Sequence, residues 1–199
     1  MSILTIDIVG IKPLIQNSER LANPLHPITQ ELRRLTTKRQ KTEEDYRILL
    51  PLEAYGGCWE NAEGFLCIPT GNVWKCLFEA ATAFKLGKSL KRALLYDPLE
   101  APPVRIDGSR TVKAHDYVYM EPQQAMFIRT VNVNGRRTLR ARPIIRQWAS
   151  THTFTILDDV LNPKDLPPVI ERAGRLVGLG EWRPLYGTFS VINTTMERG

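Results

Sequence analysis

The alternation of apolar and polar residues predicts strands near both ends of the chain. In residues 3–11 (ILTIDIVGI) apolar side chains recur at about every second position, which is the period of a half-buried strand. Residues 188–194 (TFSVINT) form a similar run near the C-terminus, and residues 144–157 contain a further strand candidate. We therefore expect the first and the last elements of the fold to be strands.

Two other segments repeat apolar residues at helical spacing. The first begins near Gly71, with Asn72 as its expected N-cap, and the second spans residues 162–178. The apolar positions are Val73, Leu77, Ala80 or Ala81 and Phe84 in the first segment, and Val169, Ile170, Ala173, Leu176 and Val177 in the second. We expect the first helix to pack on a sheet.

Residues 30–55 also favour a helix, with a basic first half and an acidic centre. A continuous helix would place Arg34, Lys38 and Lys41 on one face, because they are separated by four and three positions. Such a face could contact a polyanion. A solvent-exposed helix surface is the alternative interpretation.

A second basic set follows the helix that starts near Gly71. Lys85, Lys88 and Arg92 are separated by three and four positions, so an extension of that helix would align them. Gly87 lies between them and could end the helix before the stripe is complete.

The clearest hairpin pattern lies in residues 127–145, where Asn134-Gly135 joins two strand-like runs. This pair favours a two-residue type I′ turn, which would pair Val133 with Arg136, Val131 with Thr138 and Arg129 with Arg140. The arginines expected on one face of this ribbon are Arg129, Arg136, Arg140 and Arg142. Two opposed arginines repel each other unless an anion lies between them. Nucleic-acid contact is one interpretation of this face, and simple solvation is the other.

Composition places the chain among ordinary packed proteins. Its 199 residues suffice for one sizeable domain, and the net charge of +6 favours a polyanionic partner. The longest apolar runs fall well short of the roughly 20 residues of a membrane span. The first residues lack the basic leader of a signal peptide. We therefore expect a cytoplasmic protein without a membrane partner.

Cysteine and histidine give no pattern that indicates a metal, a cofactor or catalysis. The three cysteines are not grouped in close pairs, and the three histidines are scattered: Cys58, Cys67 and Cys76, and His26, His115 and His152. His115-Asp116 and His152 have no acid–base partner nearby in the sequence, and Asp158-Asp159 are suited to opening the second helix. We expect a binding protein and not an enzyme, with weak ribonuclease activity as the alternative.

A glycine-rich stretch, RLVGLGEWRPLYGTFSV, occupies residues 175–191. It is not a Walker loop or a dinucleotide-binding loop, because its glycines follow a helix instead of opening one. Gly178 and Gly180 lie where the chain must turn, so helix capping accounts for at least one of them.

The predicted elements follow the order strand, helix, strands, helix, strand. That order is typical of an α+β protein with a ferredoxin-like (βαββαβ), RRM-like core. Residues 1–199 are expected to form one domain. It would carry an insertion with helical segments at about 20–66 and a β-hairpin at about 125–145.

Two motifs in this order resemble the RAMP superfamily, the ferredoxin-like RNA-binding proteins of CRISPR effector complexes. Residues 177–180 (VGLG) match the first half of the family's glycine-rich loop between the second helix and the last strand, and Gly187 matches its closing glycine after a spacer one residue longer. Phe189 replaces the usual final glycine. CIPTGNVWKCLFEA (residues 67–80) is similar to the start of the first helix in backbone-type members, although Thr70 stands where glycine is expected and Lys75 is displaced by one position.

The resemblance implies a subunit of an antiviral ribonucleoprotein that assembles with copies of itself along a guide RNA. Its partners would be single-stranded guide RNA, a target DNA or RNA strand and other effector subunits, with a hairpin inserted between nucleotides. The residues expected to contact RNA are Arg34, Lys38, Lys41, Lys75, Lys85, Lys88, Arg92, Arg129, Arg136, Arg140, Arg142, Gly178, Gly180, Trp182 and Arg183.

Two alternatives remain open at the level of sequence. A phage or mobile-element protein of the same fold could bind single-stranded nucleic acid without a CRISPR partner. An assembly protein could instead use its basic faces to contact acidic protein neighbours. Nucleic acid that co-purifies with the protein would argue against the second alternative.

Overall fold

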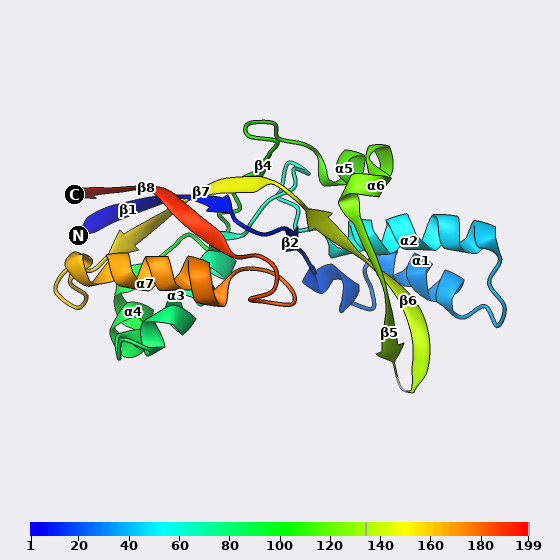
Figure 1. Ribbon diagram of the computed structural model, residues 1–199, viewed down its shortest axis with the longest axis horizontal. Helices are drawn as coiled ribbons and strands as arrows, with labels where there is room; N and C mark the ends of the chain where they lie inside the picture. The colour runs from blue at the N-terminus through cyan, green and yellow to red at the C-terminus, as the bar shows by residue number, and fades with distance from the viewer. Residues whose placement is uncertain (134, 199) are drawn as a thin grey trace.

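A computed structural model of the chain describes residues 1–133 and 135–198. The protein is of the α+β class, with antiparallel sheets and several helices (Figure 1). The main sheet has the strand order β3-β7-β1-β8, and β4 pairs with β7 beside this path. Its strands are β1 (Ser2–Gly10), β3 (Leu94–Leu95), β4 (Arg105–Ile106), β7 (Trp148–Ile156) and β8 (Phe189–Arg198). The strands predicted near both ends of the chain and before the second helix are confirmed.

Strand β1 lies at the centre of this sheet and is antiparallel to both β7 and β8. Its even positions, Leu4, Ile6 and Ile8, are fully buried, whereas its odd positions face the other side of the sheet. A register shift between Asp7 and Ile8 interrupts the pairing with β8. The alternation that predicted a half-buried strand therefore reflects one packed face and one open face.

Helices α3 (Thr70–Thr82) and α7 (Leu166–Arg172) lie side by side on the packed face (Figure 1). A π-helical turn, η3 (Ala173–Val177), continues α7. The predicted apolar positions that are buried are Val73, Leu77, Ala80, Ala81, Val169, Ile170, Ala173 and Val177. Phe84 and Leu176 are exposed instead. Phe84 lies beyond the end of α3, and the π-helical turn changes the helical period at Leu176.

The start of α3 also differs from the prediction. Pro69 is its N-cap, and Asn72 belongs to the first turn. A proline N-cap offers no side-chain acceptor, and the side chain of Thr70 bonds to buried His152. The Asn72 side chain is therefore not used to cap the helix.

Residues 30–55 form parts of two antiparallel helices, α1 (Pro27–Thr36) and α2 (Glu43–Gly57). The single basic face predicted for Arg34, Lys38 and Lys41 is therefore wrong, since Lys38 and Lys41 belong to the connection. The break has a local cause: Thr42 caps α2 in a reciprocal capping box with Asp45. Lys38 donates to that same carboxylate at 2.6 Å.

The second basic stripe is also interrupted. Helix α3 ends at Thr82, and a separate short helix, α4 (Gly87–Ala93), follows it. Lys85 lies between them with a left-handed φ of 60°, so it does not align with Lys88 and Arg92. Gly87 begins α4, whereas the sequence had suggested it as a possible end of the preceding helix.

The predicted hairpin forms a second sheet with the order β2-β6-β5. Its strands are β2 (Leu14–Ile15), β5 (Met126–Val133) and β6 (Arg136–Ile145). The pairing of Val131 with Thr138 and of Arg129 with Arg140 is confirmed, as is that of Val133 with Arg136. The turn predicted at Asn134-Gly135 and the side chain of Arg136 lie outside the described residues.

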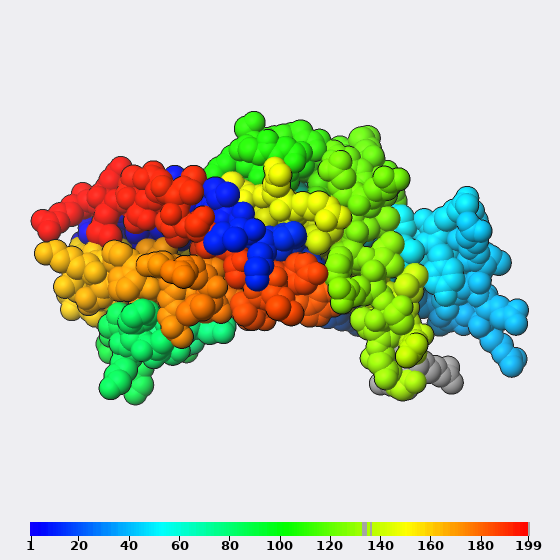
Figure 2. Space-filling view, viewed as in Figure 1, coloured from blue at the N-terminus to red at the C-terminus, as the bar shows by residue number. Residues whose placement is uncertain are grey.

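The remaining short elements surround these layers. They are the 3-10 turns η1 (Glu19–Leu21) and η2 (Pro163–Asp165) and the helices α5 (Ala114–Met120) and α6 (Pro122–Ala125). The molecule is elongated, with the main sheet at one end and α1 and α2 at the other (Figure 1). In Figure 2 the β5-β6 hairpin and the α4 region project on the same side and leave a recess between them. Among the described helices, none is long and apolar enough to cross a membrane.

Candidate nucleic-acid interface

The glycine loop, residues 178–188, connects η3 to β8 and folds tightly back on itself. Gly178, Gly180 and Gly187 have φ values of 77°, 76° and 69°. The Leu179 amide donates to the Gly187 carbonyl at 2.9 Å, which closes the loop. The loop is held against the segment after β1, because the Glu181 amide donates to the Ile15 carbonyl at 2.9 Å.

Close packing inside the chain explains why glycine is needed at these positions. A Cβ atom on Gly180 would lie 2.1 Å from the Ile15 carbonyl oxygen, and one on Gly187 would lie 1.8 Å from that of Leu179. Gly178 ends the helix, and its amide donates to the Ala173 carbonyl at 2.8 Å. Each glycine therefore has a structural role that does not require a ligand.

Two adjoining hollows lie between the glycine loop, the first turn of α3 and the segment before η1. The smaller, of about 230 Å³, is lined by Asn17, Trp59, Asn72, Lys75, Leu179, Gly180, Glu181 and Arg183. The larger, of about 430 Å³, is lined by Asn17, Ser18, Glu19, Arg20, Trp59, Glu60, Pro69 and Asn72. They share Asn17, Trp59 and Asn72, so they adjoin, and together we call them the amide groove.

At the loop end of the amide groove the negative charge is paired within the protein, whereas part of the positive charge is not. Lys75 is exposed and makes no salt bridge within the described part of the chain. The guanidinium of Arg183 lies 3.3 Å from the carboxylate of Glu79, and an exposed ion pair of this kind contributes little to stability. Glu181 accepts from Arg142 at 3.1 Å, which offsets its negative charge. This end of the groove therefore offers cationic groups to an anion.

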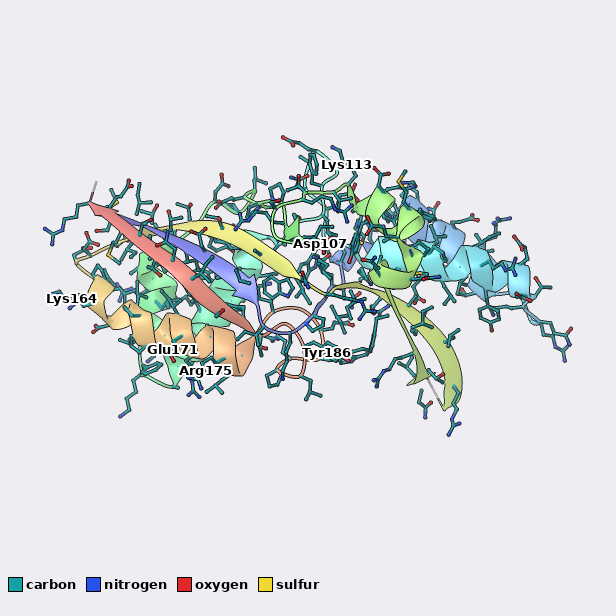
Figure 3. The ribbon with its side chains drawn as sticks, turned by 45° about the horizontal axis from the view of Figure 1, so that its top comes forward. Asp107, Lys113, Lys164, Glu171, Arg175 and Tyr186 are labelled. Atoms are coloured by element: carbon teal, nitrogen blue, oxygen red, sulfur yellow. The ribbon has the colours of Figure 1, made fainter. Side chains whose placement is uncertain are left out.

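Aromatic contacts join the glycine loop to the hairpin. Trp182 has a φ of 55°, and its ring centroid lies 5.2 Å from that of Phe127 on β5. Tyr186, labelled in Figure 3 beside the loop, packs edge-on against Phe127 at 5.6 Å. The Trp182 side chain remains 41% exposed. These contacts support a hairpin that projects from the molecule, and they leave an indole accessible beside it.

A third hollow, of about 320 Å³, lies where the hairpin meets the loop, and we call it the hairpin hollow. It is lined by Phe127, Arg129, Val131, Arg140, Arg142, Glu181 and Trp182. The guanidinium of Arg129 lies 5.1 Å from the Phe127 ring centroid, and Arg129 makes no salt bridge among the described residues. Since Glu181 lines this hollow and the amide groove, the two are neighbours.

An anion does lie beside the opposed arginines, and α2 supplies it. The buried carboxylate of Glu53 accepts from Arg140 at 2.8 Å and lies 3.6 Å from Arg142. Its other oxygen accepts from the Ala141 amide at 3.0 Å. Part of the arginine face is therefore used to attach the hairpin to α2, and among its described side chains Arg129 is the one without a salt bridge.

The structure thus separates the predicted site residues into groups. Those gathered around the glycine loop are Lys75, Arg129, Arg140, Arg142, Gly178, Gly180, Trp182 and Arg183. Arg34, Lys38 and Lys41 lie at the α1-α2 end, and Lys85, Lys88 and Arg92 lie near α4 (Figure 1). Sequence reasoning missed Asn17, Trp59 and Asn72. A tryptophan in a polar, glycine-flanked segment was the one available signal, and nothing local connected it to the others.

Buried titratable groups of the molecule have structural explanations. His152 lies between the hydroxyls of Ser150 at 2.8 Å and Thr70 at 3.1 Å, and burial lowers its pKa to about 3. Burial also raises the pKa of the Cys67 and Cys76 thiols to about 12. In the part of the chain that the structure describes, no group of three or more His, Cys, Asp or Glu side chains could hold a metal ion.

The open face of the main sheet carries small polar side chains together with Ile3 and Val9. Cross-strand neighbours on it include Thr5 with Thr153 and Asp7 with Thr151. Among the described outward positions of β1, β7 and β8 there is no aromatic residue. A sheet that stacks bases on its surface needs aromatic rings there. The groove and the hairpin hollow are therefore the better candidate interface.

Comparison with known protein families and with curated proteins returned no match to this chain.

Proposed function

We propose that this protein is an RNA-binding subunit of a ribonucleoprotein complex, built on a ferredoxin-like core of the RAMP type. The observation that carries the proposal is the meeting of three features at one place. The glycine loop, the start of α3 with Lys75 and the arginine-bearing hairpin line neighbouring hollows. Cationic groups, an exposed indole and a projecting hairpin are suited to hold a single strand.

The topology supports the ferredoxin-like part of this proposal. Read along the sheet, the strands follow the order β8-β1-β7-β3, and all neighbours are antiparallel. Helix α3 lies in the connection from β1 to β3, and α7 lies in the connection from β7 to β8. Both helices cover the same face of the main sheet. A βαββαβ unit has this arrangement. The glycine loop then occupies the connection between the second helix and the last strand.

Two of the departures from the family motifs have local physical reasons. Thr70 stands where glycine is expected, and its hydroxyl bonds to the buried His152. Phe189 replaces the final glycine, and its fully buried ring contacts the ring of Trp148 with centroids 6.2 Å apart. Both side chains are buried parts of the core of this chain, so the two departures weigh little against a shared binding mode.

Fluorescence anisotropy with single-stranded RNA tests the proposal directly. Affinity should fall at least tenfold between roughly 50 and 200 mM salt, because binding releases counterions from neutralised phosphates. The same titration with DNA of identical sequence tests the choice of RNA. Absence of binding at low salt, or affinity independent of salt, would exclude the proposal and favour a protein partner.

Self-assembly along RNA is the second part of the proposal. Light scattering with RNAs of increasing length should show that the number of bound chains grows in proportion to length. A constant one-to-one complex on long RNA would retain RNA binding but exclude the backbone role.

A further inference from the structure

The two ends of the amide groove differ in charge. At the loop end Lys75 and Arg183 accompany one carboxylate, Glu181, which already accepts from Arg142. At the other end Glu19 and Glu60 accompany one cation, Arg20. Arg20 is committed to Glu60 at 2.6 Å and to the Cys58 carbonyl at 2.7 Å. A phosphate is therefore favoured at the loop end and disfavoured at the far end.

The far end instead offers groups that suit a nucleobase. Trp59 and Pro69 supply apolar surface against which a flat ring can pack. The Asn72 side chain makes no hydrogen bond within the described residues, so its amide has a donor and an acceptor available. With about 430 Å³, this hollow falls in the size range of small-molecule sites, ~300–1,000 Å³.

We infer that the amide groove holds one nucleotide unit of the bound strand in a fixed orientation. Its phosphate lies toward Lys75 and Arg183, and its base lies against Trp59 with its edge at Asn72. This site rests on the proposed function. The glycine loop and the hairpin arginines would contact only the RNA backbone, whereas the amide groove adds a contact with a base. The amide of Asn72 can read a base edge that presents a donor beside an acceptor.

The test compares two RNA strands of roughly 12 nucleotides, one intact and one with abasic positions throughout its central half. Wild-type protein should bind the intact strand at least tenfold more tightly, since one stacked base contributes about that much. Trp59→Ala should reduce this ratio at least fivefold and leave binding of the abasic strand unchanged. Trp59→Phe should keep the ratio, because a ring remains. Lys75→Ala should weaken both strands equally.

Asn72→Ala gives a second readout that does not depend on removing a large side chain. It should change the order of affinities among four homopolymer strands while leaving their salt dependence unchanged. The inference is overturned if Trp59→Ala and Asn72→Ala, both folded by circular dichroism, keep the wild-type ratio and order. In that case salt-dependent RNA binding by the wild type would still support the proposed function. Failure of the wild type to bind RNA would remove both.

Discussion

At the scale of single residues, Gly180 shows how a motif position can be structural. Its φ of 76° and the 2.1 Å approach to the Ile15 carbonyl both exclude a side chain. Gly108 provides a matched comparison, because it has a φ of 90° and open space around its Cβ position. The two glycines share the conformational requirement, and only Gly180 adds a steric one.

Gly180→Ala should therefore cost more stability than Gly108→Ala. The Gly108 variant should lose about 1–2 kcal/mol, the cost of a left-handed alanine. The Gly180 variant should lose about 1–3 kcal/mol more, the usual cost of overpacking. Urea unfolding of both variants measures the difference. Equal losses would mean that the loop can move away from Ile15.

His152 is expected to make stability depend on pH. Its pKa is lowered from an unfolded value of about 6.5 to about 3 by burial, so the unfolded chain binds more protons between these values. The contribution of the neutral ring is complete above pH 6.5 and is lost as pH falls toward 3. Thermal unfolding should show a falling melting temperature from pH 6.5 to 4.5.

Variants at two histidines separate this effect from general acid sensitivity. His152→Gln should flatten the pH dependence above pH 4.5, and His115→Gln, at an exposed position, is the comparison variant. Lys38 and the Thr42 cap lower the pKa of Asp45 to about 2. The stability that this carboxylate contributes is complete above its ordinary pKa of 3.8 and is lost only at lower pH, so it does not affect the range from pH 6.5 to 4.5. An unchanged slope in His152→Gln would assign the dependence to other groups.

At the scale of elements, Glu53 connects α2 to the edge of β6. Its carboxylate is 3% exposed and accepts from Arg140 and from the Ala141 amide. A buried charged acceptor of this kind fixes the helix pair against the hairpin. Arg140 and Arg142 therefore contribute to stability, and their replacement tests more than RNA contact.

Glu53→Ala should lower the free energy of unfolding by about 2–4 kcal/mol, because it leaves a buried amide and a guanidinium unpaired. Glu43→Ala removes an exposed carboxylate from the same helix, paired with Arg47 at 2.7 Å, and should cost less than about 1 kcal/mol. Chemical denaturation of both variants makes the comparison. Similar losses would show that the α2-β6 contact does not depend on this carboxylate.

At the scale of the whole molecule, equal changes of charge should have unequal effects on RNA binding. Lys75→Ala with Arg129→Ala removes two cations beside the glycine loop, and Lys88→Ala with Arg92→Ala removes two from α4. The first pair should weaken binding more than tenfold and lower the salt slope by about 1.4. The second pair should change affinity less than about twofold, because these residues line neither the groove nor the hairpin hollow and the influence of exposed charges is screened with distance.

Anisotropy titrations at several salt concentrations give both quantities. Equal losses in the two double variants would indicate that RNA follows the whole basic surface, including α4. A loss confined to the second pair would place the interface away from the glycine loop.

Short-range patterns allowed much of the fold to be predicted. Period-two alternation identified β1, strand-like runs indicated β7 and β8, and helical spacing identified most of the buried face of α3 and α7. The register of the hairpin followed from Asn134-Gly135 and is the one observed. These features depend on residues close in sequence, so local stereochemistry is enough to specify them.

The predictions failed where helical spacing continued across the end of a helix. The stripe of Arg34, Lys38 and Lys41 assumed one helix, but the capping box at Thr42 starts a second one. Lys85 was aligned with Lys88 and Arg92, but α3 ends before it. Spacing alone does not reveal where a helix ends. A capping residue contributes about 1 kcal/mol, and extending a helix by a residue is only marginally favourable, so a cap can decide between ending and continuing.

The sequence by itself determined the long strands β1, β5, β6, β7 and β8, the helices α3 and α7 and the excess of positive charge, because each follows from composition or from periods of a few residues. The tertiary structure alone decided which cations remain available. Glu53, far from the hairpin in sequence, occupies Arg140, whereas Lys75 and Arg129 make no salt bridge among the described residues. It also brought Asn17, Trp59 and Asn72 to one groove. Such a site depends on the folding of distant segments against one another, and no local pattern encodes that contact.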